Sequence, residues 1–258
     1  MAEMSSEHDD ALTDARAHLA SKPDPAKPLG SLPGEFATTR AALHVVAEHL
    51  LKPKRELETG NEISLRFTPG GFGTPPWDEA EASGGPGQAR VEGVELVSVE
   101  GTSETRAPAA DLEACAGLLG VEEPDESIDA DLVVDPDAAA ALADWFALGT
   151  VVLAELIDRH PDLDPAPIRL WPEHFDVATE LGSEEAGSRA NFGASPGDED
   201  HPEPYLYVGP WDQSTAEEGW SATAFVGAEL RYADLVAADD QLAAGLEFMS
   251  DRVDALSR

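Results

Sequence analysis

The chain has 258 residues, of which 42% are hydrophobic, and it carries a formal net charge of −36 at pH 7. This amount of apolar material suffices for a sizeable core, so we expect a soluble globular protein. A surface this acidic repels phosphate backbones and anionic bilayers, which argues against nucleic-acid and membrane binding. The charge itself has two interpretations, a solvated salt-adapted surface, which we favour, or a surface that recruits basic partners.

The N-terminal residues, the apolar runs and the cysteine content indicate where in the cell the protein is expected. The first residues include Glu3, Glu7 and Asp9 without an apolar run, so we expect no signal or transit peptide. No window approaches the roughly 18 uninterrupted apolar residues of a membrane span, and we expect a cytoplasmic protein. The single cysteine, Cys115, excludes an intramolecular disulfide, and its helical alignment with apolar neighbours predicts a buried, unreactive thiol.

The predicted domain organisation is a flexible segment and linker over residues 1–34 and a single domain over residues 35–258. The apolar stripe of residues 1–20 is thin, and residues 21–34 are rich in proline and glycine. From Thr38 onward apolar residues recur at helical spacing, which predicts a helix over 38–52 that Pro53 kinks or ends.

Two ionisable side chains of this helix raise the question of a metal site. His44 and Glu48 share one face, whereas His49 lies about 140° around the helix from His44. Two groups do not complete a metal site, so a structural or interfacial histidine is favoured, and a ligand role needs a third group from elsewhere. We expect no metal.

The next segments predict strands. Residues 63–68 alternate between apolar and polar side chains, and residues 91–99 and 102–107 read as two strands with a bulge at Gly93. The glycine-rich segment 69–77 lacks the pattern of nucleotide-binding loops. The acidic stretches 78–89 and 122–131 lack the spacing of a calcium loop. No cofactor is therefore expected.

The second half predicts further elements and the fold class. Asp135 and Pro136 favour a helix start, and a broad apolar stripe extends this helix over 136–159. Residues 220–230 alternate as a strand, and residues 238–256 form a narrow helical seam suited to a sheet or to a second protomer, so a homodimer is possible. No long repeat is visible. We predict an α+β fold with a largely antiparallel sheet of about five to seven strands packed against the helices near 38–52, 136–159 and 238–256.

The stretch 168–211 is the candidate functional site. It contains short strand-like pieces joined by Gly/Pro turns, which place ionisable side chains at strand ends, where folds commonly present functional groups. Asp176 and His201 belong to this set. We predict His174 as the titratable residue, with Asp198 or Glu203 as its carboxylate partner.

Binding and catalysis are the two functions that this stretch suggests. A pocket for a small molecule or a basic protein partner would use its aromatic and charged side chains, with ligand-binding candidates Arg66, Trp171, Glu173, Tyr205, Tyr207 and Trp211. The alternative is an enzyme with a His/carboxylate acid–base or metal site around His174, for which no specific catalytic signature is present. For His174 itself a hydrogen-bonded position in the core is the favoured interpretation.

Three motifs carry a family resemblance: Trp171–Asp176 (WPEHFD), Ser195–Asp198 (SPGD) and Pro202–Trp211 (PEPYLYVGPW). With these motifs, residues 36–256 resemble a family of uncharacterised, mostly actinobacterial conserved proteins. The segment Thr68–Thr74 and the histidine-bearing helix are similar to its N-terminal half. The resemblance implies one evolutionary unit and a cytoplasmic, high-GC bacterial origin. It transfers no catalytic residues.

Overall fold

The computed structural model describes residues 2–61, 63–82, 85–124, 128, 132–213 and 220–256. These residues form two antiparallel sheets of five strands each, and in both sheets each strand pairs with the next one along the chain. The α+β class is confirmed, whereas the single sheet of about five to seven strands is wrong. The first sheet contains β1 (Arg66–Thr68), β2 (Gly71–Gly73), β3 (Gly87–Glu92), β4 (Glu95–Glu100) and β5 (Ser103–Pro108). The second contains β6 (Arg169–Trp171), β7 (Asp176–Leu181), β8 (Ala190–Ser195), β9 (Tyr205–Pro210) and β10 (Ala228–Arg231).

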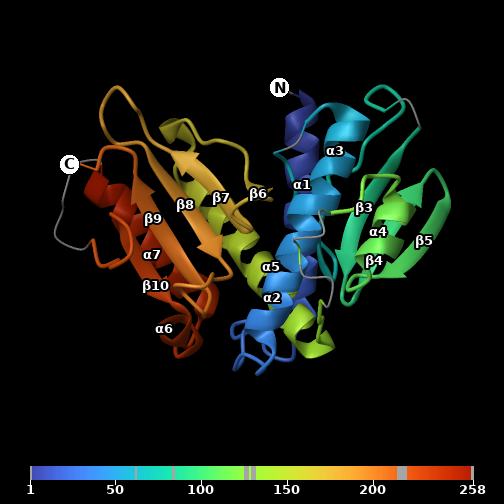
Figure 1. The fold of residues 1–258 in the computed structure, drawn as a ribbon. Coiled ribbons are helices and arrows are strands. Elements are labelled where there is room, and N and C mark those ends of the chain that lie inside the picture. Colours follow the sequence, from blue (N-terminus) through green and yellow to red (C-terminus); the bar gives the residue numbers. More distant parts are fainter. Residues whose placement is uncertain are drawn as a thin grey trace.

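The helices of residues 2–20, 36–59 and 136–159 lie between the two sheets (Figure 1). In chain order the helical segments are α1 (Ala2–Ala20), α2 (Phe36–Val46), a π-helical turn (Ala47–Leu51), α3 (Lys52–Thr59), α4 (Leu112–Leu119), α5 (Pro136–Arg159), a 3-10 turn (Pro161–Leu163), α6 (Tyr232–Val236) and α7 (Gln241–Leu256). After α1, the chain passes twice through one order of elements: a long helical segment, a five-stranded meander and a C-terminal helical segment. The fold contains a repeat that the sequence does not show.

Helix α5 is the centre of the fold and begins as predicted. The Asp135 carboxylate accepts a hydrogen bond from the backbone N–H of Ala138, at 2.9 Å, and Pro136 occupies the first turn. The helix contacts β1 and β2 of one sheet and β7 and β8 of the other. Its mean hydropathy of 1.7 over 18 residues meets the criterion for a membrane span, but 72% of that window is buried in the protein, as in a core helix.

A backbone bridge joins the two sheets. Leu65, just before β1, exchanges two hydrogen bonds with Leu170 of β6, with N···O distances of 2.8 and 3.1 Å. One continuous hydrophobic cluster spans both halves, and it includes Phe67 of β1, Phe146 of α5 and Phe192 of β8. This continuous core explains why the two repeats pack as one body.

The N-terminal segment differs from the expected flexible linker. In α1, Ala15 is 0% and Leu19 is 3% exposed, and the helix packs on α5. The segment that follows is tied to α7, because Leu29 exchanges two hydrogen bonds with the Gln241 amide, at 2.8 and 3.0 Å. The few apolar residues of this segment suffice because α5 offers an apolar surface that the local sequence does not reveal.

The helix that contains Pro53 does not end there. It continues through the π-helical turn and α3 as far as Gly60, which has a left-handed φ of 69°. Proline lacks an N–H, and its ring crowds the carbonyl of residue i−4, here His49. The wider π-helical turn ends at Leu51, two residues before Pro53, and accommodates this conflict.

Two strand predictions need correction. Gly93 has a positive φ of 62° and forms the turn between β3 and β4, so one predicted bulged strand is a hairpin. The predicted strand 220–230 is shorter: only Ala228–Arg231 pairs, with β9. Alternation predicts which side chains share a face, but pairing also requires a neighbouring strand with free backbone groups.

Candidate functional site

The outer face of the β6–β10 sheet carries an open hollow of about 660 Å³. The opposite face of this sheet packs on α5 and α7. Small residues make the hollow possible, because Ala178 of β7 and Gly209 of β9 line it without filling it. A Cβ built on Gly209 meets no atom within 4 Å. The hollow is therefore surface space that the sheet leaves unfilled.

The turn between β6 and β7 is anchored in the core by Phe175. This residue has a positive φ of 55°, which is unfavourable for a non-glycine residue, and its side chain is only 1% exposed. Its ring stacks on His44 of α2, with centroids 5.0 Å apart, and the His44 Nε2 lies 3.0 Å from the Pro172 carbonyl oxygen. These contacts hold the turn so that its neighbours His174 and Asp176 line the hollow.

His44 thus has the structural role that its sequence favoured. Burial lowers its pKa, against the opposing charge of Glu48 and the backbone of Pro172. Its Nε2 lies 3.9 Å from a Glu48 carboxylate oxygen. In the part of the chain that the structure describes, no three His, Cys, Asp or Glu side chains lie close enough to hold a metal ion.

The loop between β8 and β9 is held from α2. Arg40 is 7% exposed and donates a hydrogen bond from Nη1 to the Pro202 carbonyl oxygen, at 3.2 Å. Within the loop, Asp198 accepts backbone N–H bonds from Asp200 and His201, at 2.8 and 2.7 Å. Asp198 lines the hollow, but one of its oxygens is already engaged in shaping this turn.

A buried carboxylate forms the polar centre of the hollow. Asp176 is 6% exposed, and its Oδ2 accepts a hydrogen bond from the Tyr207 hydroxyl. Its Oδ1 is buried and has no hydrogen-bond partner. Burial raises the pKa of Asp176, against the Tyr207 hydrogen bond and the charge of His174, which lower it. Burial, followed by the charge of Asp176, raises the pKa of Tyr207 well above its ordinary value.

Strand β8 lies between Asp176 and Tyr207, and it permits their contact because it has a glycine, Gly193, at this position. Tyr207 on β9 and Asp176 on β7 lie on either side of β8, where Gly193 is the register partner of Tyr207. The ring of Tyr207 lies against Gly193, and a Cβ built there would overlap its Cε1. The missing side chain lets the tyrosine cross one strand and reach the carboxylate on the next.

Aromatic side chains surround this carboxylate. Trp171 of β6 is the register partner of Asp176 and lines the hollow. Tyr205 and Tyr207 have ring centroids 6.2 Å apart, and Phe225 lies 6.4 Å from the first and 6.2 Å from the second. The hollow therefore combines one buried anionic group with several π-faces, a composition typical of ligand sites.

Five of the nine predicted site residues line the hollow: Trp171, His174, Asp198, Tyr205 and Tyr207. His174 is exposed, so the favoured interpretation as a core histidine is wrong. Among the contacts of the described residues, His174 forms no hydrogen bond or ion pair with Asp198 or Glu203. His174 interacts electrostatically with Glu173 and Asp176.

Four predicted residues lie elsewhere. Glu203 is exposed and does not line the hollow. The Glu173 carboxylate accepts a hydrogen bond from Lys52, at 2.6 Å; burial acts to raise its pKa, but this bond and the lysine charge lower it. Trp211 borders a separate surface depression and donates its indole N–H to Asn191, at 2.9 Å.

Arg66 lines a different cavity, of about 190 Å³, at the junction of the two sheets. Arg55 and Arg169 also line that cavity. Arg169 additionally borders the hollow, from the first residue of β6. Arg66 is therefore separated from the predicted aromatic residues, because it belongs to the first sheet.

The sequence analysis did not predict Asp176 as the central polar group. It placed this residue near a strand end, but Asp198 and Glu203 were the predicted partner carboxylates. A usable signal was present, since Asp176 lies in phase with Ala178 and Glu180 on β7, and therefore on the face of that strand opposite Val177 and Thr179. Phe225, which also lines the hollow, was placed within a strand.

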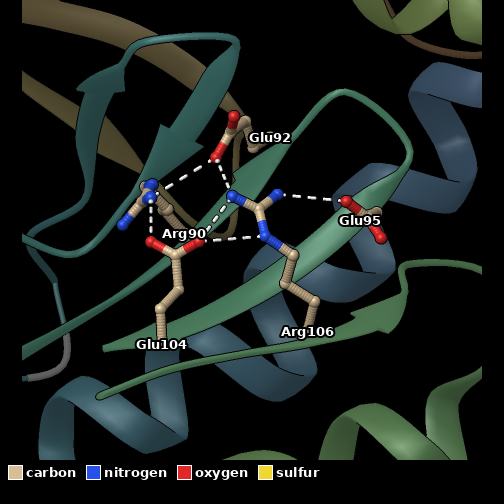
Figure 2. A network of polar contacts seen from close by, with 5 residues as sticks. All are labelled: Arg90, Glu92, Glu95, Glu104 and Arg106. Carbon is tan, nitrogen blue, oxygen red and sulfur yellow. Dashed lines mark hydrogen bonds and ion pairs between the residues drawn. The ribbon is translucent and has the colours of Figure 1, made fainter. Parts of the chain in front are cut away.

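The corresponding face of the first sheet carries a different surface. Figure 2 shows Arg106 bridging Glu92, Glu95 and Glu104, at 3.0, 3.0 and 2.6 Å, while Arg90 also contacts Glu92 and Glu104. These hydrogen bonds raise the pKa of Arg106 and lower that of Glu104. The charged groups of this face thus bind one another, whereas the hollow of the second sheet contains a buried polar atom without a partner.

Comparison with known proteins gives no match: no family model, no curated protein and no solved structure is similar to the chain.

Proposed function

We propose that the protein is a cytoplasmic binding module whose hollow on the β6–β10 sheet receives a small molecule or a segment of a protein partner. The hollow combines aromatic walls with polar and charged side chains, and both kinds of group are used by ligand sites. It lies on a sheet whose other face is packed on α5 and α7, so the scaffold beneath it is rigid.

The observation that carries this proposal is the unpartnered Oδ1 of Asp176. Buried polar atoms in native proteins are nearly always hydrogen-bonded, and leaving one without a partner costs about 1–3 kcal/mol. A ligand that donates a hydrogen bond to Oδ1 would remove this cost. The unpartnered Oδ1 thus lowers the stability of the free protein, and a ligand that binds it would raise that stability again.

Catalysis at His174 is the second candidate. In its favour, His174 and the carboxylate of Asp176 line the same hollow and interact electrostatically. Against it, the contacts of the described residues contain no hydrogen bond that orients the His174 imidazole. Binding therefore remains the better-supported proposal.

The test blocks the hollow without disturbing the sheet. Gly209→Phe places a ring in the open space of the hollow, and aromatic residues are well accommodated in strands such as β9. Gly209→Ala is the matched control, because it leaves most of the hollow open. Wild type and both variants are screened against a library of metabolites and short peptides by thermal shift. A ligand at about 100 times its Kd stabilises the native state by about 2.7 kcal/mol.

We expect library members that stabilise wild type and Gly209→Ala but not Gly209→Phe. A ligand that stabilises all three proteins equally binds outside the hollow. If every ligand found behaves in that way, the proposed site is wrong.

A further inference from the structure

We propose that the group bound at the centre of the hollow is a protonated amine or guanidinium, which donates a hydrogen bond to Asp176 Oδ1 and lies among the surrounding aromatic rings. This inference rests on the proposed binding function and specifies its ligand. The chemistry has two sources, a free organic amine or a lysine or arginine side chain of a partner, and the experiment separates them.

The position of Asp176 favours a charged donor over a neutral one. Its side chain is almost fully buried, and the Tyr207 hydroxyl engages one of its oxygens, so a single acceptor atom remains for a ligand. A hydrogen bond between an ionised donor and a carboxylate is roughly twice as strong as one between neutral groups. A buried carboxylate therefore gains most from a cationic donor.

The rings around Asp176 suit the same kind of group. Trp171 is its direct cross-strand neighbour on β6, and the Tyr207 hydroxyl contacts it from β9. A cation at Oδ1 would therefore have the side chains of Trp171 and Tyr207 as neighbours, and aromatic faces attract ammonium and guanidinium groups. Tyr205 and Phe225 continue this apolar wall along the hollow, where the alkyl stem of such a ligand packs.

The other charged groups of the hollow do not replace a ligand. Glu180 is neutralised by Arg189, at 2.9 Å, and Asp198 shapes its own turn. Arg169 and His174 border the hollow, but in the described residues neither donates a hydrogen bond to Asp176. On a larger scale, the net charge of −36 attracts cationic ligands and repels anionic ones.

The experiment compares a lysine peptide with an uncharged peptide of similar shape and with a free amine. Binding to wild-type protein is measured by isothermal titration calorimetry with the peptide acetyl-Gly-Lys-Gly-amide, with the same peptide carrying norleucine in place of lysine, and with butylamine as the free amine. We expect the lysine peptide to bind about tenfold or more tightly than the norleucine peptide. Butylamine binding alone would assign the site to small amines, whereas preference for the peptide assigns it to a protein segment.

Two variants then test whether the preference for the lysine peptide depends on the charge of Asp176. Asp176→Asn should reduce lysine-peptide affinity by about tenfold or more, whereas Glu113→Gln, which removes an exposed charge on α4, should change it by less than about twofold. Folding of each variant is checked by its melting temperature. The wild-type comparison of lysine with norleucine stands even if Asp176→Asn does not fold.

The outcomes separate this inference from the binding function beneath it. If both peptides bind equally to wild type and Gly209→Phe abolishes binding, the hollow is a binding site but its cation specificity is wrong. If neither peptide nor butylamine binds at about 1 mM, the proposal of a cationic ligand is likewise refuted. The thermal-shift screen then remains the test of whether the hollow binds any ligand. Binding of the lysine peptide that survives both Asp176→Asn and Gly209→Phe refutes the site itself.

Discussion

The hydrogen bond between Tyr207 and Asp176 allows a quantitative test of the site. Tyr207→Phe removes the side-chain hydrogen bond that Asp176 Oδ2 accepts, and leaves the buried carboxylate without a side-chain donor among the described residues. A hydrogen bond to a charged group contributes about 1.5–3 kcal/mol. With a melting-temperature change of about 2–4 °C per kcal/mol for a protein of this size, the expected decrease is about 3–12 °C.

The assay is urea denaturation followed by tryptophan fluorescence, together with thermal melts, for wild type, Tyr207→Phe, Asp176→Asn and the double variant. In the Asp176→Asn background the hydrogen bond becomes neutral and contributes only about 0.5–1.5 kcal/mol. The coupling energy in this double-mutant cycle is therefore expected to be about 1 kcal/mol. An unchanged denaturant slope checks that the unfolding reaction is the same in all four proteins.

Tyr205→Phe is the matched control, because Tyr205 lies on the same strand and face but its hydroxyl interacts with Ser195 instead. It should cost no more than a neutral hydrogen bond, about 0.5–1.5 kcal/mol. If Tyr207→Phe costs as little as this control, or costs the same with Asp or Asn at position 176, the carboxylate is not the group that Tyr207 stabilises.

Two further predictions concern the same residues. Burial raises the pKa of Asp176, so its protonated form stabilises the native state at low pH, and this contribution is lost as pH rises from the ordinary value of 3.8 through the raised native pKa. The free energy of unfolding of Asp176→Asn, measured in urea between about pH 3 and 7, should therefore increase relative to wild type as pH rises, and a pH-independent difference would contradict this. Gly193→Ala should push away the ring of Tyr207 and destabilise the protein by about 1–3 kcal/mol, whereas Gly209→Ala should be nearly neutral; equal effects in denaturation would refute the contact described for Gly193.

Local patterns in the sequence were sufficient for the elements whose stability is local. The cap at Asp135, the proline after it and the broad apolar stripe specify α5 without knowledge of its surroundings. Cys115 is buried as its helical spacing indicated, and burial raises its pKa to about 12. Most residues that line the hollow belong to the stretch 168–211, which its interleaved aromatic and ionisable residues singled out, whereas Ala166, Pro167, Gln213, Phe225 and Val226 lie outside it.

The tertiary structure decided which of these side chains meet. Asp176 and Tyr207 are 31 residues apart and on strands that are not neighbours, so their contact depends on two strand registers and on glycine in the strand between them. Alternation along one strand identifies a face but does not say which strands pair, and so it could not choose Asp176 over Asp198 or separate Arg66 from Trp171. The repeated layout of the two halves also became visible only in three dimensions, because a topology can recur without shared residues.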